Sequence, residues 1–275
     1  MSGRGRVLIA AGSDSSGGAG IQADIKTVIA LGGYAATAIT ALTAQNTLNV
    51  FRVLSVSPDF VAQQMRVVLE DIGADAIKTG MLHTAGVIEA VADVIEERGI
   101  GVPLVVDPVM VAKSGAFLLD PDAVLALKQR LLVHAEIATP NVPEAMVLTG
   151  MAEIRDLADM RHAAQLIRSL GPRAVLIKGG HLESETVIDL LSTEDDEEVF
   201  EGPRIHTPHT HGTGCTLASA IATSLAQGLD LSQSVRRARA YLEQAILTAP
   251  GFGHGHGPLN HGHTVGPFPV PEGKT

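Results

Sequence analysis

The feature that most constrains this chain is the alternation of short apolar runs with longer segments of helical periodicity. Residues 7–11 and 104–106 are apolar runs bounded by Gly, Pro or charged residues, and the strand expected at 174–178 is an apolar run that ends in Lys178. Residues 20–31, in contrast, carry apolar side chains at spacings of three and four. Strands that alternate with helices predict a mostly parallel sheet with helices on both faces, because right-handed crossovers place the helices there. We therefore predict an α/β protein with three layers, α/β/α.

The same reasoning places the remaining elements. Further strands are expected at 36–42, 50–56, 76–78, 136–139 and 187–191, and further helices from Pro58, at 86–97, from Asp120-Pro121, and at 143–148, 157–170, 215–226 and 232–248. The acidic run 194–198 is expected to be a solvated hairpin tip. No internal repeat or linker interrupts the pattern, so we expect one domain over residues 1–263.

Composition and charge exclude several classes of protein. The 275 residues are 45% hydrophobic, enough for a large core, and the formal net charge of −10 disfavours a nucleic-acid partner. No apolar run approaches the roughly 20 residues that a membrane-spanning helix needs. The single cysteine cannot form an internal disulfide, and the first residues lack the order of a signal peptide. We expect a cytoplasmic protein that is not a membrane protein.

Unusual polar clusters follow five of the expected strands. They are residues 12–18, 80–81, 107–110, 139–141 and 178–181. Ligands of open parallel sheets bind in the crevice at the carboxyl ends of the strands. The five clusters therefore predict one binding site along one edge of the sheet.

Each cluster also has a purely structural explanation. The glycine-rich residues 12–18 match neither the P-loop pattern nor the dinucleotide fingerprint and could form only a tight turn. Asp107 could cap a turn, Glu144 could interact with a helix dipole, and Lys178 could be a surface lysine lying along apolar surface. Gly179 and Gly180 favour function at Lys178, because they leave room for a ligand beside the backbone.

The most specific signal is residues 211–216, His-Gly-Thr-Gly-Cys-Thr, which open a helix. Gly212 and Gly214 on either side of Thr213 let successive backbone N–H groups converge, and the helix start adds partial positive charge. This arrangement predicts an anion hole, and Cys215 beside it suits a phosphoryl group that is being transferred. A glycine-bracketed helix start with a space-filling cysteine is the structural alternative.

Taken together, these residues resemble the hydroxymethylpyrimidine/phosphomethylpyrimidine kinase family of the ribokinase-like superfamily. The resemblance covers residues 6 to about 263 and rests on seven motifs and a C-terminal signature, at residues 12–24, 43–46, 78–81, 107–111, 139–144, 178–181, 211–216 and 253–261. It implies transfer of phosphate from ATP, with Mg²⁺, to the hydroxymethyl group of a small aminopyrimidine and then to its monophosphate. It also implies a homodimer, since members of the superfamily commonly pair.

The resemblance also assigns roles to individual residues. Asp24 and Gln45 would read the polar edge of the pyrimidine. Residues that would line the same pocket are Gly12, Gly80, Met81 and Val109. Asp107 and Glu144 would organise Mg²⁺ and its waters, with Asn141 beside the nucleotide. Lys178 would meet the phosphates, and Gly212, Thr213 and Gly214 would form the anion hole.

Cys215 would face the acceptor hydroxyl. A cysteine at a helix N-terminus is expected to have a lowered pKa, and its thiolate would be a weak base for an alcohol. Phosphoryl transfer asks little of a base early in the reaction. We therefore expect the anion hole and Mg²⁺ to dominate the rate, and Cys215 mainly to guide the proton.

Three further segments carry weaker expectations. The histidines outside the phosphate loop, at 206, 209, 254, 256, 261 and 263, are expected to be solvated or structural rather than metal ligands. Residues 111–117 are expected to form a mobile lid over the phosphates. Residues 264–275, rich in Pro and Gly, are expected to form a disordered tail.

Three other functions compete with the kinase. Pyridoxine/pyridoxal kinase is closest, since its substrate also carries a hydroxymethyl group on a heteroaromatic ring. Gln45 favours the aminopyrimidine, because a carboxamide both donates and accepts hydrogen bonds. A non-catalytic sensor would not need metal, phosphate and proton groups on one edge, and a nicotinamide-dependent oxidoreductase lacks its fingerprint.

Overall fold

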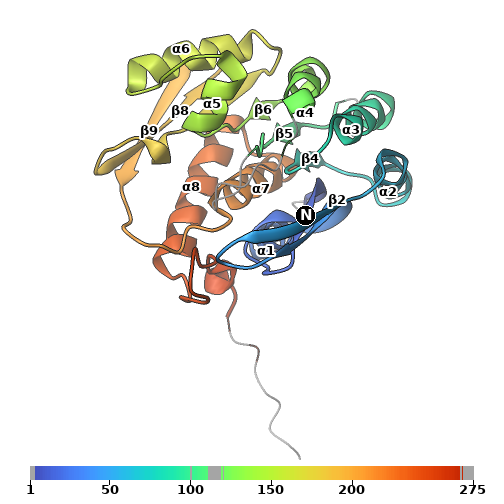
Figure 1. Cartoon of the computed structure of the whole chain (residues 1–275), viewed down its shortest axis with the longest axis horizontal. Coiled ribbons are helices and arrows are strands. Elements are labelled where there is room, and N and C mark those ends of the chain that lie inside the picture. The colour runs from blue at the N-terminus through green and yellow to red at the C-terminus, as the bar shows by residue number, and fades with distance from the viewer. Residues whose placement is uncertain (1–3, 100, 111–118, 120, 267, 269–275) are drawn as a thin grey trace, which may run out of the picture.

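The computed structural model describes residues 4–99, 101–110, 119, 121–266 and 268. Its centre is a nine-stranded sheet in the order β3-β2-β1-β4-β5-β6-β7-β8-β9 (Figure 1). The six strands from β2 to β7 run parallel, while β3, β8 and β9 pair antiparallel. The strands are β1 Arg6–Asp14, β2 Tyr34–Gln45, β3 Val50–Ser55, β4 Ala76–Thr79, β5 Leu104–Val106, β6 Ile137–Ala138, β7 Ala174–Lys178, β8 Thr186–Ser192 and β9 Glu197–Pro203.

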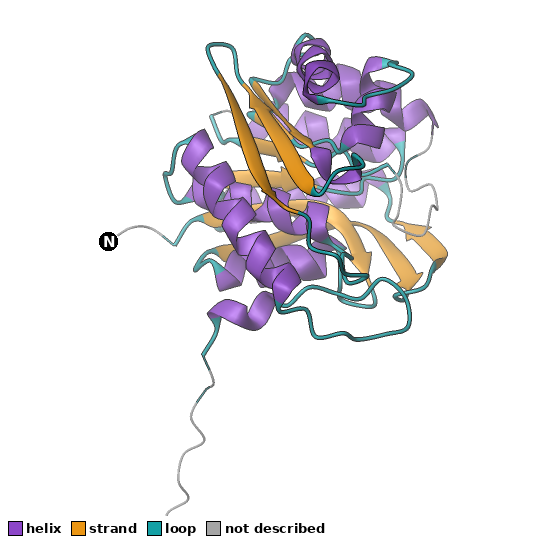
Figure 2. Ribbon diagram, turned by 90° about the vertical axis from the view of Figure 1, so that its left-hand side faces the viewer, coloured by secondary structure: helices purple, strands orange, loops and turns teal. Residues whose placement is uncertain are grey.

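Helices cover both faces of the sheet, so the predicted three-layer α/β/α architecture is confirmed. One face carries α1 Gly20–Ala30, α7 Thr213–Ala226 and α8 Leu231–Leu247. The other carries α2 Pro58–Asp71, α3 Ala85–Arg98, α4 Pro121–Ala126, α5 Val142–Thr149 and α6 Leu157–Arg168. Each face has its own core, because the central strands bury side chains on both sides. Figure 2 shows helices on both sides of the strands, in a view turned by 90°.

Local sequence explains where many helices begin. Thr84, Asn141, Asp156 and Asp230 are N-caps whose side chains accept a hydrogen bond from a first-turn amide. Pro58 opens α2, where its missing N–H costs nothing. The predicted helix from Asp120-Pro121 begins at Pro121 in the structure and continues as a π-helix, Leu127–Leu131, and a 3₁₀ turn, Leu132–His134; Asp120 lies outside the described residues.

The strand that the sequence pattern did not predict is β9. Its sequence, Glu-Glu-Val-Phe-Glu-Gly-Pro, is mostly polar, and Phe200 is its one buried residue. The acidic run 194–198 is therefore only partly a hairpin tip. Residues 194–196 are exposed at the tip, whereas Glu198 accepts a hydrogen bond from Ser232 Oγ at 2.6 Å and pairs with Arg236.

The chain stays ordered slightly beyond the predicted start of the tail. Thr264 belongs to a 3₁₀ turn, His261–Thr264, and its hydroxyl donates to the carbonyl of Ala30 at 3.0 Å. Most of the remaining tail and the expected lid, residues 111–117, lie outside the described residues. Within the part of the chain that the structure describes, no helix is both long and apolar enough to cross a membrane.

A buried ion pair joins the sheet to the helical layer of α1 and α7. Lys78 on β4 donates to both carboxylate oxygens of Asp24 on α1, at 2.9 and 3.0 Å, and Ser219 on α7 donates to the same carboxylate at 2.7 Å. Both charged side chains are fully buried. Although burial opposes a charged ammonium, the carboxylate of Asp24 keeps the pKa of Lys78 above its ordinary value.

We expect Lys78→Met to destabilise the protein by about 3–5 kcal/mol, because it leaves the carboxylate of Asp24 buried without its cation. Equilibrium unfolding in urea measures this free energy. The double variant Lys78→Met/Asp24→Asn removes both charges and keeps an acceptor for Ser219, so we expect it to recover most of the loss. A double variant no more stable than Lys78→Met would contradict this view of the pair.

Candidate active site

A cavity of about 980 Å³ lies at the carboxyl ends of the parallel strands. All five polar clusters contribute to its wall, together with residues 210–215 at the start of α7. The structure thus brings together segments that lie far apart in the sequence, as the parallel sheet requires.

The charged centre of the cavity consists of Lys178, Asp107 and Glu144. Lys178 Nζ lies 3.0 Å from Asp107 Oδ1 and 4.0 Å from Glu144 Oε2. All three side chains are largely buried, with the Lys178 side chain 14% exposed. Burial acts against the charge of Lys178, but the two carboxylates raise its pKa. Lys178 therefore remains a cation at the cavity wall.

Glu144 has a structural role as well as its place in this cluster. Its carboxylate accepts a hydrogen bond from the Asn141 amide at 2.8 Å, and Asn141 Oδ1 accepts from the Glu144 amide at 2.9 Å. This reciprocal pair is the capping box of α5. Burial raises the pKa of Glu144 to about 7, against the opposing effect of Lys178. Glu144 and Asn141 therefore cap α5, a role that goes beyond the helix-dipole interaction suggested for Glu144 from the sequence.

The donor set fits Mg²⁺ that also binds a substrate phosphate. Asp107 is 2% exposed, and its Oδ2 is a buried oxygen without a hydrogen-bond partner among the described residues. Within those residues no group of three or more His, Cys, Asp or Glu side chains is arranged to hold a metal alone. Mg²⁺ commonly uses one or two carboxylates plus waters and phosphate oxygens. Asp107 and Glu144 would supply that protein share.

The backbone at the start of the predicted anion loop requires a glycine. Gly212 has φ +86°, and a Cβ there would collide with the carbonyl oxygen of Gly18. The amides of Gly214 and Cys215 donate to no other described residue, and the Thr213 amide makes only a long contact, 3.4 Å, with the Thr210 carbonyl. A Cβ at Gly214 would lie 3.3 Å from Lys178 Nζ. Amides without a protein partner and a lysine ammonium therefore lie close together in the wall of the cavity, which suits a phosphoryl group.

Cys215 lines the cavity, but its acidity is opposite to the expectation. Burial raises the pKa of the thiol to about 12, and Asp24 and Asp107 add to this effect, against the opposing influence of Lys78. The lowered pKa that we expected from the helix start is therefore wrong, because desolvation and two nearby carboxylates outweigh the helix end. At neutral pH the group is a thiol.

The wall beside this charged centre is narrow and partly apolar. Gly12, Gly80, Met81, Val109 and Gln45 all line the cavity. A Cβ at Gly12 would displace the end of the Met81 side chain, so the two residues pack closely at this wall. A flat ring fits between such surfaces, with the Gln45 amide as the polar group.

Asp24 does not reach this wall. It is 0% exposed and does not line the cavity, because its carboxylate is bonded to Lys78 and Ser219. The expected role of Asp24 in reading the pyrimidine edge is corrected accordingly. Asp24 lies behind the cavity, where it forms an ion pair with Lys78.

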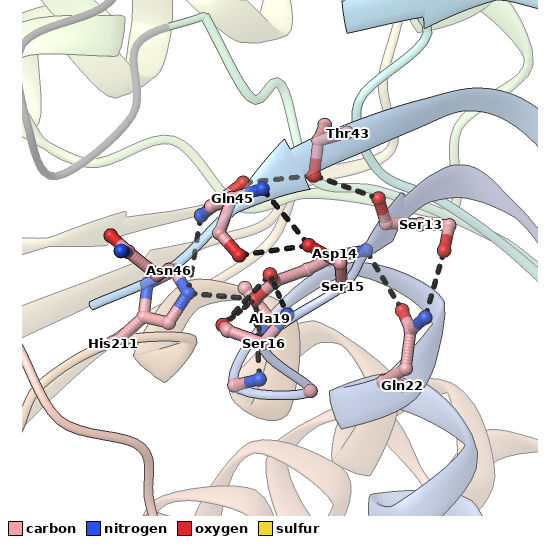
Figure 3. A network of polar contacts seen from close by, with 12 residues as sticks. Ser13, Asp14, Ser15, Ser16, Ala19, Gln22, Thr43, Gln45, Asn46 and His211 are labelled. Carbon is pink, nitrogen blue, oxygen red and sulfur yellow. Dashed lines mark hydrogen bonds and ion pairs between the residues drawn. The ribbon is translucent and has the colours of Figure 1, made fainter. Parts of the chain in front are cut away.

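A polar network that the sequence motifs did not indicate connects the end of β1 and the loop after it to the anion loop (Figure 3). His211 Nε2 lies 2.8 Å from Asp14 Oδ2 and 3.3 Å from the Gln45 amide. Asp14 also accepts hydrogen bonds from the amides of Ser16 and Ala19, both at 2.8 Å. Asp14 stands inside the quoted motif 12–18, but its partner is 197 residues away and only the fold brings them together.

The far side of the cavity was also missed. Its residues come from β8, β9 and α8, and include Val187, Phe200, Arg236, Arg239 and Ile246. The guanidinium groups of Arg236 and Arg239 lie 5.6 and 5.4 Å from the centre of the Phe200 ring. No motif marked these residues, and β9 itself was not predicted.

Two histidines outside the anion loop differ in their surroundings. His206 is exposed and pairs with Glu185, and His261 lies 3.2 Å from the Tyr241 hydroxyl in a buried cluster. Burial lowers the pKa of His261 to about 4.

Residues 251–258 form what we call the C-terminal strap. The amide of His256 donates to the Thr47 carbonyl at 2.8 Å, and the Gly257 carbonyl accepts from the His211 amide at 3.1 Å. A Cβ at Gly253 or Gly255 would collide with Thr47. The strap therefore joins the β2–β3 loop to the anion loop.

Comparisons with known proteins agree with this geometry. Residues 14–260 match the family model described as phosphomethylpyrimidine kinase. The chain is 46% identical to a hydroxymethylpyrimidine/phosphomethylpyrimidine kinase of Streptomyces coelicolor, over 94% of this chain and 95% of the relative. It is 52% identical, over 94% of its length, to a thiamine biosynthesis bifunctional protein of Geobacter sulfurreducens, of which it spans only 52%.

Solved structures give the same fold. The crystal structure of an ADP complex of Bacillus subtilis pyridoxal kinase superposes with a TM-score of 0.86 at 37% identity, covering 94% of this chain and 97% of that one.

We expect Cys215 to resist alkylation near neutral pH, because its pKa of about 12 leaves almost no thiolate. The rate with iodoacetamide at pH 8 should be at least ~10-fold below that of a free thiol and should keep rising up to pH 10. Cys215 is the only cysteine, so mass spectrometry of the intact protein reports it alone. A rate that levels off below pH 9 would mean that the helix start controls the thiol after all.

Proposed function

This chain belongs to the phosphomethylpyrimidine kinase family, and from that premise we propose that it is an ATP-dependent kinase of 4-amino-5-hydroxymethyl-2-methylpyrimidine and of its monophosphate, in thiamine biosynthesis. The observation that carries the proposal is the set of free amides at Gly214 and Cys215 beside the Lys178 ammonium and the unpartnered oxygen of Asp107. A terminal phosphoryl group with its metal has complementary charge at every one of these points.

The acceptor ring would lie against Gly12, Gly80, Met81 and Val109. An aminopyrimidine presents a ring nitrogen that accepts and an amino group that donates, and the Gln45 carboxamide can satisfy both. The nucleotide would extend from the anion loop toward β9 and α8. The ADP found with the structurally similar pyridoxal kinase supports ATP as the phosphate donor.

The transfer itself exchanges one P–O bond for another. The hydroxymethyl oxygen bonds to the γ-phosphorus, and the bond from that phosphorus to the β–γ bridging oxygen breaks, so ADP leaves with the bonding electrons. Lys178 and the amides of Thr213, Gly214 and Cys215 would neutralise charge on the transferring group. Mg²⁺ at Asp107 and Glu144 would supply further charge neutralisation on the phosphate oxygens.

Cys215 would act as a neutral thiol in this reaction. With a pKa of about 12 it is not poised to accept a proton at neutral pH. It would hold the acceptor hydroxyl in line, and the proton would leave for a phosphate oxygen as the new bond forms. Such positioning is worth a large share of the barrier in a loose transition state.

We also propose that residues 1–263 work as one kinase domain, in the cytoplasm and as a homodimer. The single sheet supports the first point. For the dimer, β3 is an edge strand, and Leu42 and Leu54 face each other across the β2–β3 pair while being 43% and 58% exposed. Leu48 and Phe51 add exposed apolar surface to the same hairpin. A second copy of the hairpin would cover this surface.

Replacing Leu42 and Leu54 together by Lys is expected to shift the protein from dimer to monomer, because it places charges in the proposed contact. Light scattering coupled to size-exclusion chromatography measures the mass. Leu125→Lys on α4 alters a similarly exposed leucine (57%) elsewhere and should leave the mass unchanged. A wild-type mass of one chain would refute the dimer.

The kinase proposal predicts that the purified protein, with ATP and Mg²⁺, converts the hydroxymethylpyrimidine to its monophosphate and then to its diphosphate. ADP release and the mass of the product measure this conversion. We expect Lys178→Met to lose at least ~100-fold in kcat/KM, since a charge that neutralises the transferring group is lost. Lys128→Met, which replaces a partly exposed lysine, is the matched control and should leave kcat/KM unchanged.

The same assay separates the alternatives. The similarity to pyridoxal kinase at 37% identity makes pyridoxal the second substrate to test, and preferential turnover of pyridoxal would replace the pyrimidine assignment. Binding of either ring without ADP release would favour a sensor. Cys215→Ala within about threefold of wild type, or about 0.7 kcal/mol, would remove Cys215 from the chemistry.

A further inference from the structure

The carboxylate of Asp14 is fixed by an unusual number of donors. It accepts from the Ser16 hydroxyl at 2.8 Å and from the amides of Ser16, Gly18 and Ala19 at 2.8, 3.2 and 2.8 Å. Burial acts to raise the pKa of Asp14, but the hydrogen bonds from His211 and Ser16 outweigh burial and lower it. An ionised carboxylate only accepts hydrogen bonds. The His211 nitrogen 2.8 Å from it must therefore carry a hydrogen.

The imidazole of His211 has little freedom to turn away. The residue is 7% exposed, and its amide is bonded to the Gly257 carbonyl of the C-terminal strap. The ring lies so close to Gly18 that a Cβ there would collide with Cδ2. The Nε2–H bond is thus held in one direction by packing on both sides.

The same Nε2 lies 3.3 Å from the Gln45 side chain, with Gln45 Nε2 on that side. Two N–H donors cannot hydrogen-bond each other, so a protonated His211 Nε2 favours the amide rotated by half a turn, with its oxygen toward the imidazole. Thr43 agrees with this rotation. In the structure its hydroxyl lies within reach of two acceptors, the Ser13 carbonyl at 3.0 Å and Gln45 Oε1 at 3.2 Å, but it has one hydrogen to donate. With the Gln45 amide rotated, that hydrogen goes to Ser13 and the Thr43 oxygen accepts from the Gln45 N–H.

We propose that the Asp14–His211 pair selects which end of the Gln45 amide faces each neighbour, and so determines which way round the substrate ring binds. The inference rests on the proposed function and deepens it. Gln45 retains one N–H and one carbonyl lone pair for a ligand, and His211 determines which of the two lies at which end of the Gln45 amide. His211 is a positioning residue and Gln45 a specificity residue.

Ring orientation matters because the substrate is not symmetric. The amino group of the pyrimidine is adjacent to the hydroxymethyl group. When the Gln45 oxygen accepts from the amino group and its N–H donates to the neighbouring ring nitrogen, the direction of the hydroxymethyl group is therefore fixed. With the amide reversed, donor meets donor and acceptor meets acceptor. The ring then loses its hydrogen bonds or turns its hydroxymethyl group away from Cys215.

The kinetic test compares His211→Leu with His211→Gln and with His209→Leu, a control two residues away in the same loop. We expect His211→Leu to raise the KM for the pyrimidine at least ~10-fold with the KM for ATP within about twofold. His211→Gln, which keeps an amide N–H for Asp14, should recover part of this loss. The Gln45→Leu variant has no amide to orient, so adding His211→Leu to it should raise the KM for the pyrimidine by less than about twofold.

A second measurement does not depend on turnover. In wild-type protein labelled with ¹⁵N-histidine, NMR at neutral pH should show a hydrogen on His211 Nε2, assigned by its loss in His211→Gln. An unprotonated Nε2 would overturn the inference even if the kinase proposal holds. So would a His211→Leu variant whose KM for ATP rises while its KM for the pyrimidine does not, because His211 would then serve only the anion loop.

The two proposals fail separately. If the wild-type protein turns over neither ring, the proposed function fails, and the NMR result still decides whether Asp14 holds His211 in the required form. If turnover is normal and the His211 and Gln45 substitutions act independently of each other, the kinase stands and the orientation of Gln45 has another cause.

Discussion

Two buried pairs of lysine and carboxylate constrain the geometry of this molecule. Lys78 with Asp24 lies behind the cavity, and Lys178 with Asp107 lies at its wall, beside Gly214 at the start of α7. A buried charge that loses its partner is costly, so the first pair ties β4 to α1 and the second ties the end of β7 to the residue that follows β5. The free amides of Gly214 and Cys215 are consequently presented beside fixed charges rather than beside a mobile surface.

The pairs also explain the state of Cys215. A thiol at a helix start is usually more acidic, yet here burial and the carboxylates of Asp24 and Asp107 oppose ionisation more strongly than Lys78 promotes it. A protonated thiol is compatible with a reaction in which positioning and charge neutralisation carry most of the barrier. The site is therefore organised around the phosphoryl group rather than around a strong base.

Much of this could be predicted from local sequence. The alternation of strand and helix predicts the sheet, and a parallel sheet places the carboxyl ends of its strands on one edge, which is why Asp107, Asn141 and Lys178 could be grouped in advance. The anion loop was visible because two glycines bracket a helix start. These inferences need only the hydrophobic periodicity, the direction of the chain and the positions of glycines.

What could not be predicted depends on pairing across the fold. Nothing near Asp24 in the sequence reveals that Lys78 would take its carboxylate away from the cavity, or that His211 would meet Asp14. Strand β9 was missed because its stability comes from pairing with β8 and from burying Phe200, not from its own composition. Such features require the three-dimensional partner to be known.

The C-terminal strap has a consequence for the order in which the molecule is assembled. Its backbone joins Thr47, two residues from Gln45, to His211 at the head of the anion loop, so it links two segments that border the cavity. During synthesis on the ribosome, the sheet can pair long before residues 251–258 emerge. A chain whose sheet has paired but whose residues 251–258 have not yet emerged would therefore have a formed core and a cavity wall that lacks the strap.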